Sequence, residues 1–294
     1  MKGTNLCHSK FFDIFCAGNF KQVKVKGTGS GYAKNPERIK NILYILILLH
    51  FTGPSLYAQD AKDIVERANE KINGEKSGYS VMSMTIIRPE WERTLEFKGW
   101  TLGTDYALTV ITSPARDRGQ AYLKRASEMW SWNPDISRMI KLPPAMMSQG
   151  WMGSDYTNDD ILRESSVVED YNHEIIAEEE IEGRLCYKIR LTAKEGATVI
   201  WGHQLRWISK EDYLFLKAEL YDEEGYLVRT ELGKEIKTRD GRLIPTVMEI
   251  IPEDEEGYKT IVEIKEIKFN ITVEDGFFSQ QNLQRADRLI NKKY

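Results

Sequence analysis

Cysteine and histidine are scarce in this chain, which limits both how the fold can be held together and what chemistry it can support. The 294 residues include 3 cysteines and 4 histidines. Cys7 and Cys16 precede a short apolar run, so Cys186 is the one cysteine after it. A single cysteine cannot form an internal disulfide, and we therefore expect a hydrophobic core to hold the fold.

An excess of positive charge is also lacking once the first 58 residues are set aside. Residues 1–58 hold 8 Lys/Arg and 2 Asp/Glu, whereas residues 59–294 hold 33 Lys/Arg and 43 Asp/Glu, a net charge of −10. A nucleic-acid backbone binds clustered positive charge, and residues 59–294 contain no basic stripe that would supply it. Nucleic acid is therefore not an expected partner.

A hydrophobic run long enough to span a membrane as a mature helix is missing as well. The apolar run at 42–51 is short, follows the basic residues Arg38 and Lys40, and is followed by Ala58. This order is typical of a signal peptide, here cleaved after Ala58. We expect residues 1–58 to be an N-terminal extension plus signal peptide, and residues 59–294 to form one domain, soluble in the periplasm. The alternative for 42–51 is a buried core helix or a retained membrane anchor.

The remaining residues predict a β-rich fold with few helices. Apolar residues recur at helical spacing over 60–73, which predicts one amphipathic helix capped by Asp60. Alternation with a period of two begins near Tyr79 and returns after residue 185 in runs separated by short turns, such as Asp240-Gly241. Short connections favour antiparallel pairing. We predict a mainly β (α+β) fold: a single large curved antiparallel sheet, an unclosed barrel of about 10–11 strands. The helix and the segments 146–162 and 277–289 would cover it.

No catalytic or metal-binding constellation is found in residues 59–294. His173 and His203 lack metal-ligand spacing and are interpreted as structural residues. The oxygen-rich stretch 154–160 lacks the central glycine and closing glutamate of a calcium loop, so Thr157 or Asn158 is interpreted as a helix cap. The glycines at 150–153 do not follow a strand into a long helix as a phosphate-binding loop does. We predict no catalytic residue, no metal and no cofactor, and hence a protein that is not an enzyme.

Large apolar side chains gather instead between residues 130 and 156. Methionine adapts to irregular apolar shapes, and tryptophan offers a large surface with one polar tip, so together they suit a pocket for flexible chains. An ordinary core plug beneath the sheet is the alternative. The candidate ligand-binding residues are Trp130, Trp132, Met139, Met146, Met147, Trp151, Met152 and Tyr156.

The stretch from Arg116 to Leu162 resembles the LolA-like outer-membrane lipoprotein-sorting family. The elements that carry the resemblance are Arg118-Gly119, Tyr122-Leu123-Lys124, residues 130–134, Lys141-Leu142-Pro143 and Met152-Gly153-Ser154-Asp155-Tyr156. The resemblance implies an unclosed barrel around an apolar cavity. It also implies a periplasmic carrier of a lipoprotein acyl chain or another lipid, with a membrane transporter or acceptor protein as a possible partner. The same fold also serves as an envelope-stress sensor that binds a regulatory protein, which is the alternative function.

Overall fold

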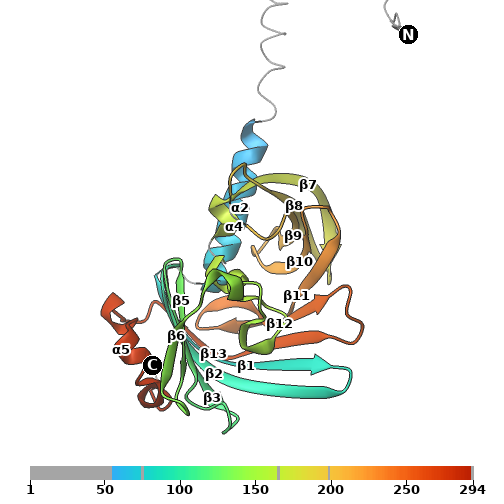
Figure 1. Ribbon diagram of the computed structural model, residues 1–294. Coiled ribbons are helices and arrows are strands. Elements are labelled where there is room, and N and C mark those ends of the chain that lie inside the picture. Colours follow the sequence, from blue (N-terminus) through green and yellow to red (C-terminus); the bar gives the residue numbers. More distant parts are fainter. Residues whose placement is uncertain (1–54, 74–75, 164–165, 198, 293–294) are drawn as a thin grey trace, which may run out of the picture. The chain divides into compact units, whose positions relative to one another are not determined.

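The computed structural model describes residues 55–73, 76–163, 166–197 and 199–292 (Figure 1). The chain divides into two units, Met1–Phe51 and Thr52–Tyr294, and all the described residues belong to the second. The expected signal segment at 42–51 lies outside the described residues. Among the helices of the described part, none is both long and apolar enough to cross a membrane.

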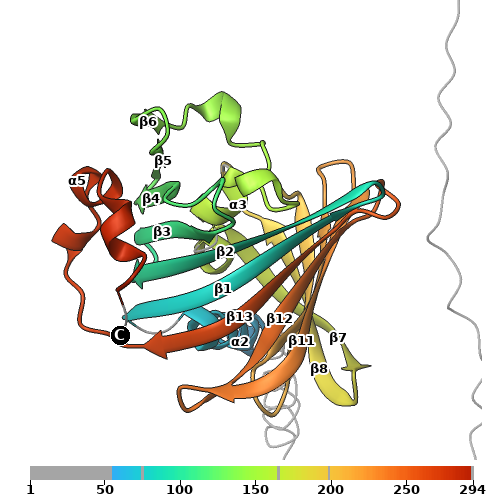
Figure 2. The same ribbon diagram turned by 90° about the horizontal axis from the view of Figure 1, so that it is seen from below.

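One antiparallel sheet of 13 strands forms most of the second unit, and it curves without closing (Figure 2). Its spatial order is β6-β5-β4-β3-β2-β1-β13-β12-β11-β10-β9-β8-β7. The strands are β1 (Ser77–Arg88), β2 (Trp91–Leu102), β3 (Tyr106–Ser113), β4 (Ala121–Arg125), β5 (Glu128–Asn133), β6 (Arg138–Lys141), β7 (Tyr171–Ile181), β8 (Arg184–Ala193), β9 (His203–Ser209), β10 (Phe215–Tyr221), β11 (Leu227–Arg239), β12 (Arg242–Pro252) and β13 (Lys259–Phe269).

The predicted fold class is confirmed, with more strands than the 10–11 expected. The long edge strand β7 carries Glu178, Glu179 and Glu180 in succession, which obscures the apolar alternation that marks a strand. Tight turns explain why neighbouring strands pair antiparallel. Asp240 and Gly241 join β11 to β12 with φ of 46° and 78°, the geometry of a two-residue hairpin turn that favours Asp-Gly.

The amphipathic helix α2 (Ser55–Asn73) lies within the curve of the sheet (Figure 1). Ala61, Ile64, Val65 and Ala68 are buried and pack with residues of β7, β8, β9 and α4 (Ser166–Glu169). The helix begins at Ser55, earlier than the expected start near Asp60, and the proposed cleavage after Ala58 falls in its first turn. The cleavage site stays a prediction.

The C-terminal segment covers the opposite face of β1–β5. It comprises η3 (Asp275–Phe277), α5 (Gln280–Leu283) and η4 (Ala286–Leu289), which lie outside the curved sheet in Figure 2. Phe278 and Leu283 are fully buried there against Trp100, Leu108 and other strand residues. Between β6 and β7 the chain forms η1 (Pro144–Met146), η2 (Trp151–Gly153) and α3 (Asn158–Arg163). All three segments expected to cover the sheet therefore do so, on two different faces.

Candidate functional site

An apolar cavity of about 380 Å³ lies on the inner side of the sheet, beneath α2. That volume is in the range of pockets that hold small organic ligands. Strand alternation places apolar side chains on this inner face, and α2 adds the apolar side chains of its buried face. The apolar lining includes Val65, Ala68 and Ile72 of α2, Met82 and Phe97 of β1 and β2, Met248 of β12, and Val262, Ile264, Ile267 and Phe269 of β13.

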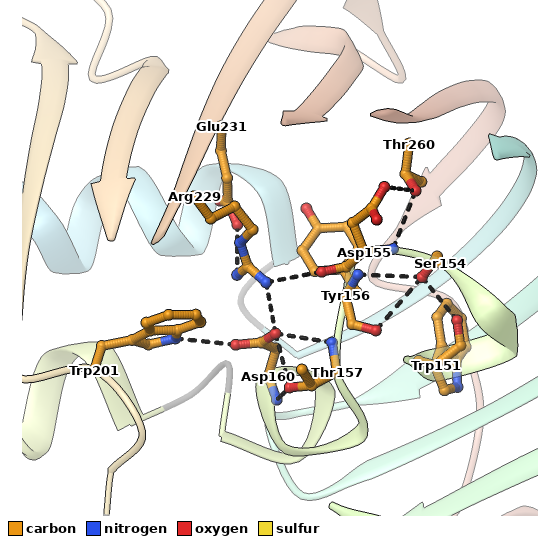
Figure 3. A network of polar contacts seen from close by, with 10 residues as sticks. All are labelled: Trp151, Ser154, Asp155, Tyr156, Thr157, Asp160, Trp201, Arg229, Glu231 and Thr260. Carbon is orange, nitrogen blue, oxygen red and sulfur yellow. Dashed lines mark hydrogen bonds and ion pairs between the residues drawn. The ribbon is translucent and has the colours of Figure 1, made fainter. Parts of the chain in front are cut away.

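The segment 150–160 crosses one end of the sheet and contributes Trp151 to the cavity wall. Trp151 is 8% exposed, and its ring makes edge contacts with Phe97 and Tyr122, with centroids 5.9 Å away in both cases. A compact turn holds the tryptophan in place: its backbone N–H donates to the Tyr156 carbonyl at 2.6 Å, and the Ser154 hydroxyl donates to the Trp151 carbonyl at 2.7 Å (Figure 3).

Asp155 fastens this segment to two neighbouring strands. Its carboxylate pairs with Arg88 of β1 at 2.8 Å and accepts a hydrogen bond from the Thr260 hydroxyl of β13 at 2.6 Å. The Arg88 and Asp155 side chains are 11% and 8% exposed, so water screens this ion pair little. The middle of the segment is thereby held over β1 and β13.

Asp160 fastens the C-terminal end of the segment to β11. Thr157 and Asp160 form a reciprocal helix cap at the start of α3, in which the Asp160 carboxylate accepts from the Thr157 N–H at 2.9 Å and the Thr157 hydroxyl accepts from the Asp160 N–H at 3.0 Å. The same carboxylate also accepts from Arg229 at 2.7 Å and from the Trp201 indole N–H at 3.0 Å (Figure 3). The expectation that this oxygen-rich stretch caps a helix is confirmed, with Thr157 as the cap.

Arg229 is the centre of the polar network on the inner face. Its guanidinium pairs with Asp160 and, at 2.8 Å, with Glu231, and it donates to the Asp155 carbonyl at 3.1 Å. Burial lowers the pKa of Arg229, but the two carboxylates outweigh burial and raise it. Burial likewise raises the pKa of Asp160, whereas attraction to Arg229 and the Thr157 donors outweigh it and hold that pKa below its ordinary value. Both side chains are therefore charged near neutral pH.

The eight candidate residues from the sequence fall into three places. Trp151 and Tyr156 line the cavity, and Met152 packs in the same cluster without lining it. Met146 and Met147 are half-buried in the connection before η2 and do not line the cavity. The other three, Trp130, Trp132 and Met139, pack on the opposite face of the sheet with the C-terminal segment.

Sequence reasoning missed the polar residues of the wall. Arg229 and Glu231 stand two apart in β11 and so share one face, but the local pattern does not indicate that this face is the inner one. Trp201 lies in the connection between β8 and β9, where no periodicity marks it. The sequence signal that could have identified this wall is the pair of opposite charges at Arg229 and Glu231, two positions apart in one strand.

The two histidines of the described part make structural contacts. His173 is buried on β7, with Nε2 at 2.8 Å from the Val167 carbonyl, and His203 stacks on Tyr221 with ring centroids 4.2 Å apart. Among the described residues, no group of three His, Cys, Asp or Glu side chains could hold a metal ion.

Comparison with known proteins shows which family shares this architecture. A family model described as "Uncharacterized protein" matches residues 103–285, more than half of the chain. A crystal structure of a DUF1329 family protein from Desulfovibrio piger is 25% identical, with a TM-score of 0.70 over 77% of this chain and 99% of that one. No curated protein matches the chain.

Two further crystal structures share the fold. A putative outer membrane lipoprotein-sorting protein domain from Vibrio parahaemolyticus is 19% identical, with a TM-score of 0.67 over 78% of this chain and 100% of that one. A LolA superfamily protein from Nitrosomonas europaea is 24% identical, with a TM-score of 0.64 over 75% of this chain and 98% of that one. With the family-model match, these likenesses identify the chain as a member of the LolA-like family.

Proposed function

We propose that the chain is a periplasmic carrier that shelters the acyl chain of a lipoprotein, or another lipid, in its apolar cavity during passage between membranes. The observation that carries the proposal is the cavity of about 380 Å³, lined by apolar side chains of α2, β1, β2, β12 and β13. The fold is that of the LolA-like family, and one relative is described as a putative outer membrane lipoprotein-sorting protein domain.

Reversible burial supplies the affinity in this proposal. Each methylene group removed from water contributes about 0.8 kcal/mol, so about six methylenes supply roughly 5 kcal/mol before the costs of association. Part of an acyl chain is therefore enough for useful binding. The carrier performs no covalent chemistry: it excludes water from the chain and releases it to a membrane transporter or acceptor protein.

Uptake of lipid by the purified protein tests the proposal. Native mass spectrometry and solvent extraction should reveal co-purified lipid, and a fluorescent acyl probe should bind and be displaced by unlabelled lipid. Thr109 of β3 lines the cavity, so the larger side chain in Thr109→Phe should weaken probe binding by about tenfold or more. Thr238→Phe on β11 is the control, because Thr238 is exposed and lies outside the lining; it should bind as the wild type does.

A protein that is empty and takes up no probe would overturn the carrier function. Crosslinking in the native envelope adds a second discriminating result. Recovery of lipoproteins or transporter subunits agrees with the carrier, whereas recovery of a regulatory membrane protein alone would indicate the sensor function instead.

A further inference from the structure

The cavity has two chemically different walls. The side formed by β1, β2, β12 and β13 is apolar, with residues such as Phe97 and Ile264. The side formed by β9, β11 and the segment 150–160 carries polar and charged groups. These are Gln204, Arg206, Arg229, Glu231, Asp159 and Asp160. An apolar chain can lie against the first wall while a polar head lies against the second.

The charges on the polar wall nearly cancel, and one negative charge remains in excess. Its charged residues are two arginines and three carboxylates, so the sum over the described lining residues is −1. The Arg229 side chain is 5% exposed. Its guanidinium makes ion pairs with Asp160 at 2.7 Å and Glu231 at 2.8 Å. The guanidinium carbon lies over two aromatic rings, 4.9 Å from the centre of the Trp201 ring and 5.3 Å from the centre of the Tyr156 ring.

Arg206 is engaged in a similar way. Its Nε donates to the Gln204 side-chain carbonyl at 3.0 Å, and its guanidinium carbon lies 5.3 Å from the centre of the Phe215 ring. An anionic ligand head would therefore find both cations of the wall already in contact with other groups. Among the described residues, Arg229 Nε is buried without a hydrogen-bond partner, so it can donate one hydrogen bond to a ligand head. A carboxylate head that paired with the whole guanidinium would have to displace Asp160 or Glu231 and leave that buried charge uncompensated, which is strongly unfavourable.

We propose that the cavity accepts acyl chains whose head carries no negative charge, such as acylglycerols or other ester- and amide-linked acyl groups, and discriminates against free fatty acids. This inference rests on the proposed carrier function and names its ligand class. An uncharged head with hydroxyl or carbonyl groups can hydrogen-bond to the wall without breaking its ion pairs. A carboxylate loses its hydration and meets a wall whose excess charge has the same sign.

Competition between amphiphiles of one chain length tests the inference. A fatty acid, a monoacylglycerol and an alkylamine are compared as competitors for an uncharged fluorescent acyl probe near neutral pH, below their micelle concentrations. The monoacylglycerol and the alkylamine should displace the probe at concentrations about tenfold or more below the fatty acid. Equal or tighter binding of the fatty acid overturns the inference and leaves the carrier function standing. Failure of every amphiphile to bind overturns both.

The variant Glu231→Gln identifies the source of the discrimination. It keeps the size and a hydrogen-bond acceptor beside Arg229 but removes one negative charge, so the fatty acid should bind about tenfold more tightly while the monoacylglycerol is unchanged. Glu266→Gln on the exposed side of β13 is the matched control and should leave both affinities unchanged. Asp159→Asn is a second variant in case Glu231→Gln does not fold. An unchanged ratio in the folded variants overturns the inference.

Discussion

The guanidinium of Arg229 is a buried charge on the inner face with two carboxylate partners. The guanidinium contacts Asp160 and Glu231, and Arg229 as a whole is 4% exposed. Buried ion pairs of this kind add little net stability compared with apolar packing, yet removal of one partner leaves the others uncompensated. The residue is therefore expected to be intolerant of substitution even though its contribution to folding is modest.

Replacement of Arg229 tests whether the loss of one partner from this ion-pair network costs much more stability than the loss of an exposed ion pair. Arg229→Gln should lower the free energy of unfolding by about 3–5 kcal/mol, measured by urea denaturation, because two buried carboxylates lose their cation. Lys237→Gln is the control, since its pair with Glu235 has side-chain exposures of 47% and 59%, and it should have little effect. Similar small losses in both variants would show that the Arg229 network is not a buried ion-pair system.

Protonation of Asp160 should make the stability of the fold depend on pH. Its folded-state pKa lies below the ordinary value of the unfolded chain because attraction to Arg229 outweighs burial. Such a group stabilises the fold above its unfolded pKa, and the stabilisation is lost as pH falls through the folded pKa. The stability gap between wild type and Asp160→Asn should be large near neutral pH and should shrink below about pH 4.

Chemical denaturation at neutral and acidic pH measures this gap. Asp254→Asn, in the exposed turn between β12 and β13, is the control and should change stability little at either pH. A gap for Asp160→Asn that stays constant into acid would contradict the assignment of Asp160 as the titrating partner of Arg229.

At the scale of elements, the segment 150–160 is positioned by backbone contacts as much as by its side chains. Gly150 approaches the Ser154 carbonyl so closely that an added Cβ would lie 2.4 Å from its oxygen. This approach closes the turn that directs Trp151 into the cavity wall, and Asp155 and Asp160 then fasten the segment to β1, β13 and β11. A methyl group at Gly150 should therefore displace the whole turn.

The substitution Gly150→Ala tests this steric role. It should lower the free energy of unfolding by about 1–3 kcal/mol and change the tryptophan fluorescence of the protein, because overpacking forces the backbone around Trp151 to move. Gly276→Ala is a matched control, since a Cβ there meets nothing within 4 Å and the backbone does not have a positive φ. Equal stability of both variants would show that the turn accommodates a side chain freely.

At the scale of the whole molecule, the buried thiol of Cys186 reports on global opening. The residue is fully buried in β8, and burial raises its pKa, so it should react with a thiol reagent only when the sheet opens. A ligand that binds only the folded state stabilises it by mass action. An uncharged acylglycerol at about 100 times its Kd should therefore slow the labelling of Cys186 by roughly 100-fold.

The labelling experiment uses the Cys7→Ser/Cys16→Ser variant, so that Cys186 is the only thiol. At the same lipid concentration, the labelling of Thr109→Phe should be slowed by about tenfold or less, because the larger side chain weakens binding by about tenfold or more. A rate that is insensitive to lipid in the wild-type cavity, while the acyl probe binds, would mean that labelling proceeds through local opening rather than global unfolding.

Features that depend on neighbouring residues could be predicted from the sequence. Alternation with a period of two predicted the strands, and short turns predicted antiparallel pairing. Thr157 or Asn158 ahead of acidic residues predicted a helix start, which the structure confirms with Thr157 as the cap. The LolA-like resemblance predicted the family, and the family-model match together with the structural likenesses confirms it. Each of these features is encoded by residues close together in the chain, or by motifs in a fixed order.

The candidate site was predicted only in part, because alternation defines two faces of a strand and not which of them is concave. Both faces of β1–β5 are covered, so Trp130 and Trp132 could equally have lined the cavity, whereas they pack beneath the C-terminal segment. Arg229 meets Asp160 across 69 positions of sequence, a contact that no local pattern encodes. The sequence by itself determined most of the elements and the antiparallel pairing of strands joined by short turns. The pairing of β1 with β13, the curvature of the sheet and the crossing of segment 150–160 depend on contacts between distant residues, and they decided which side chains form the cavity.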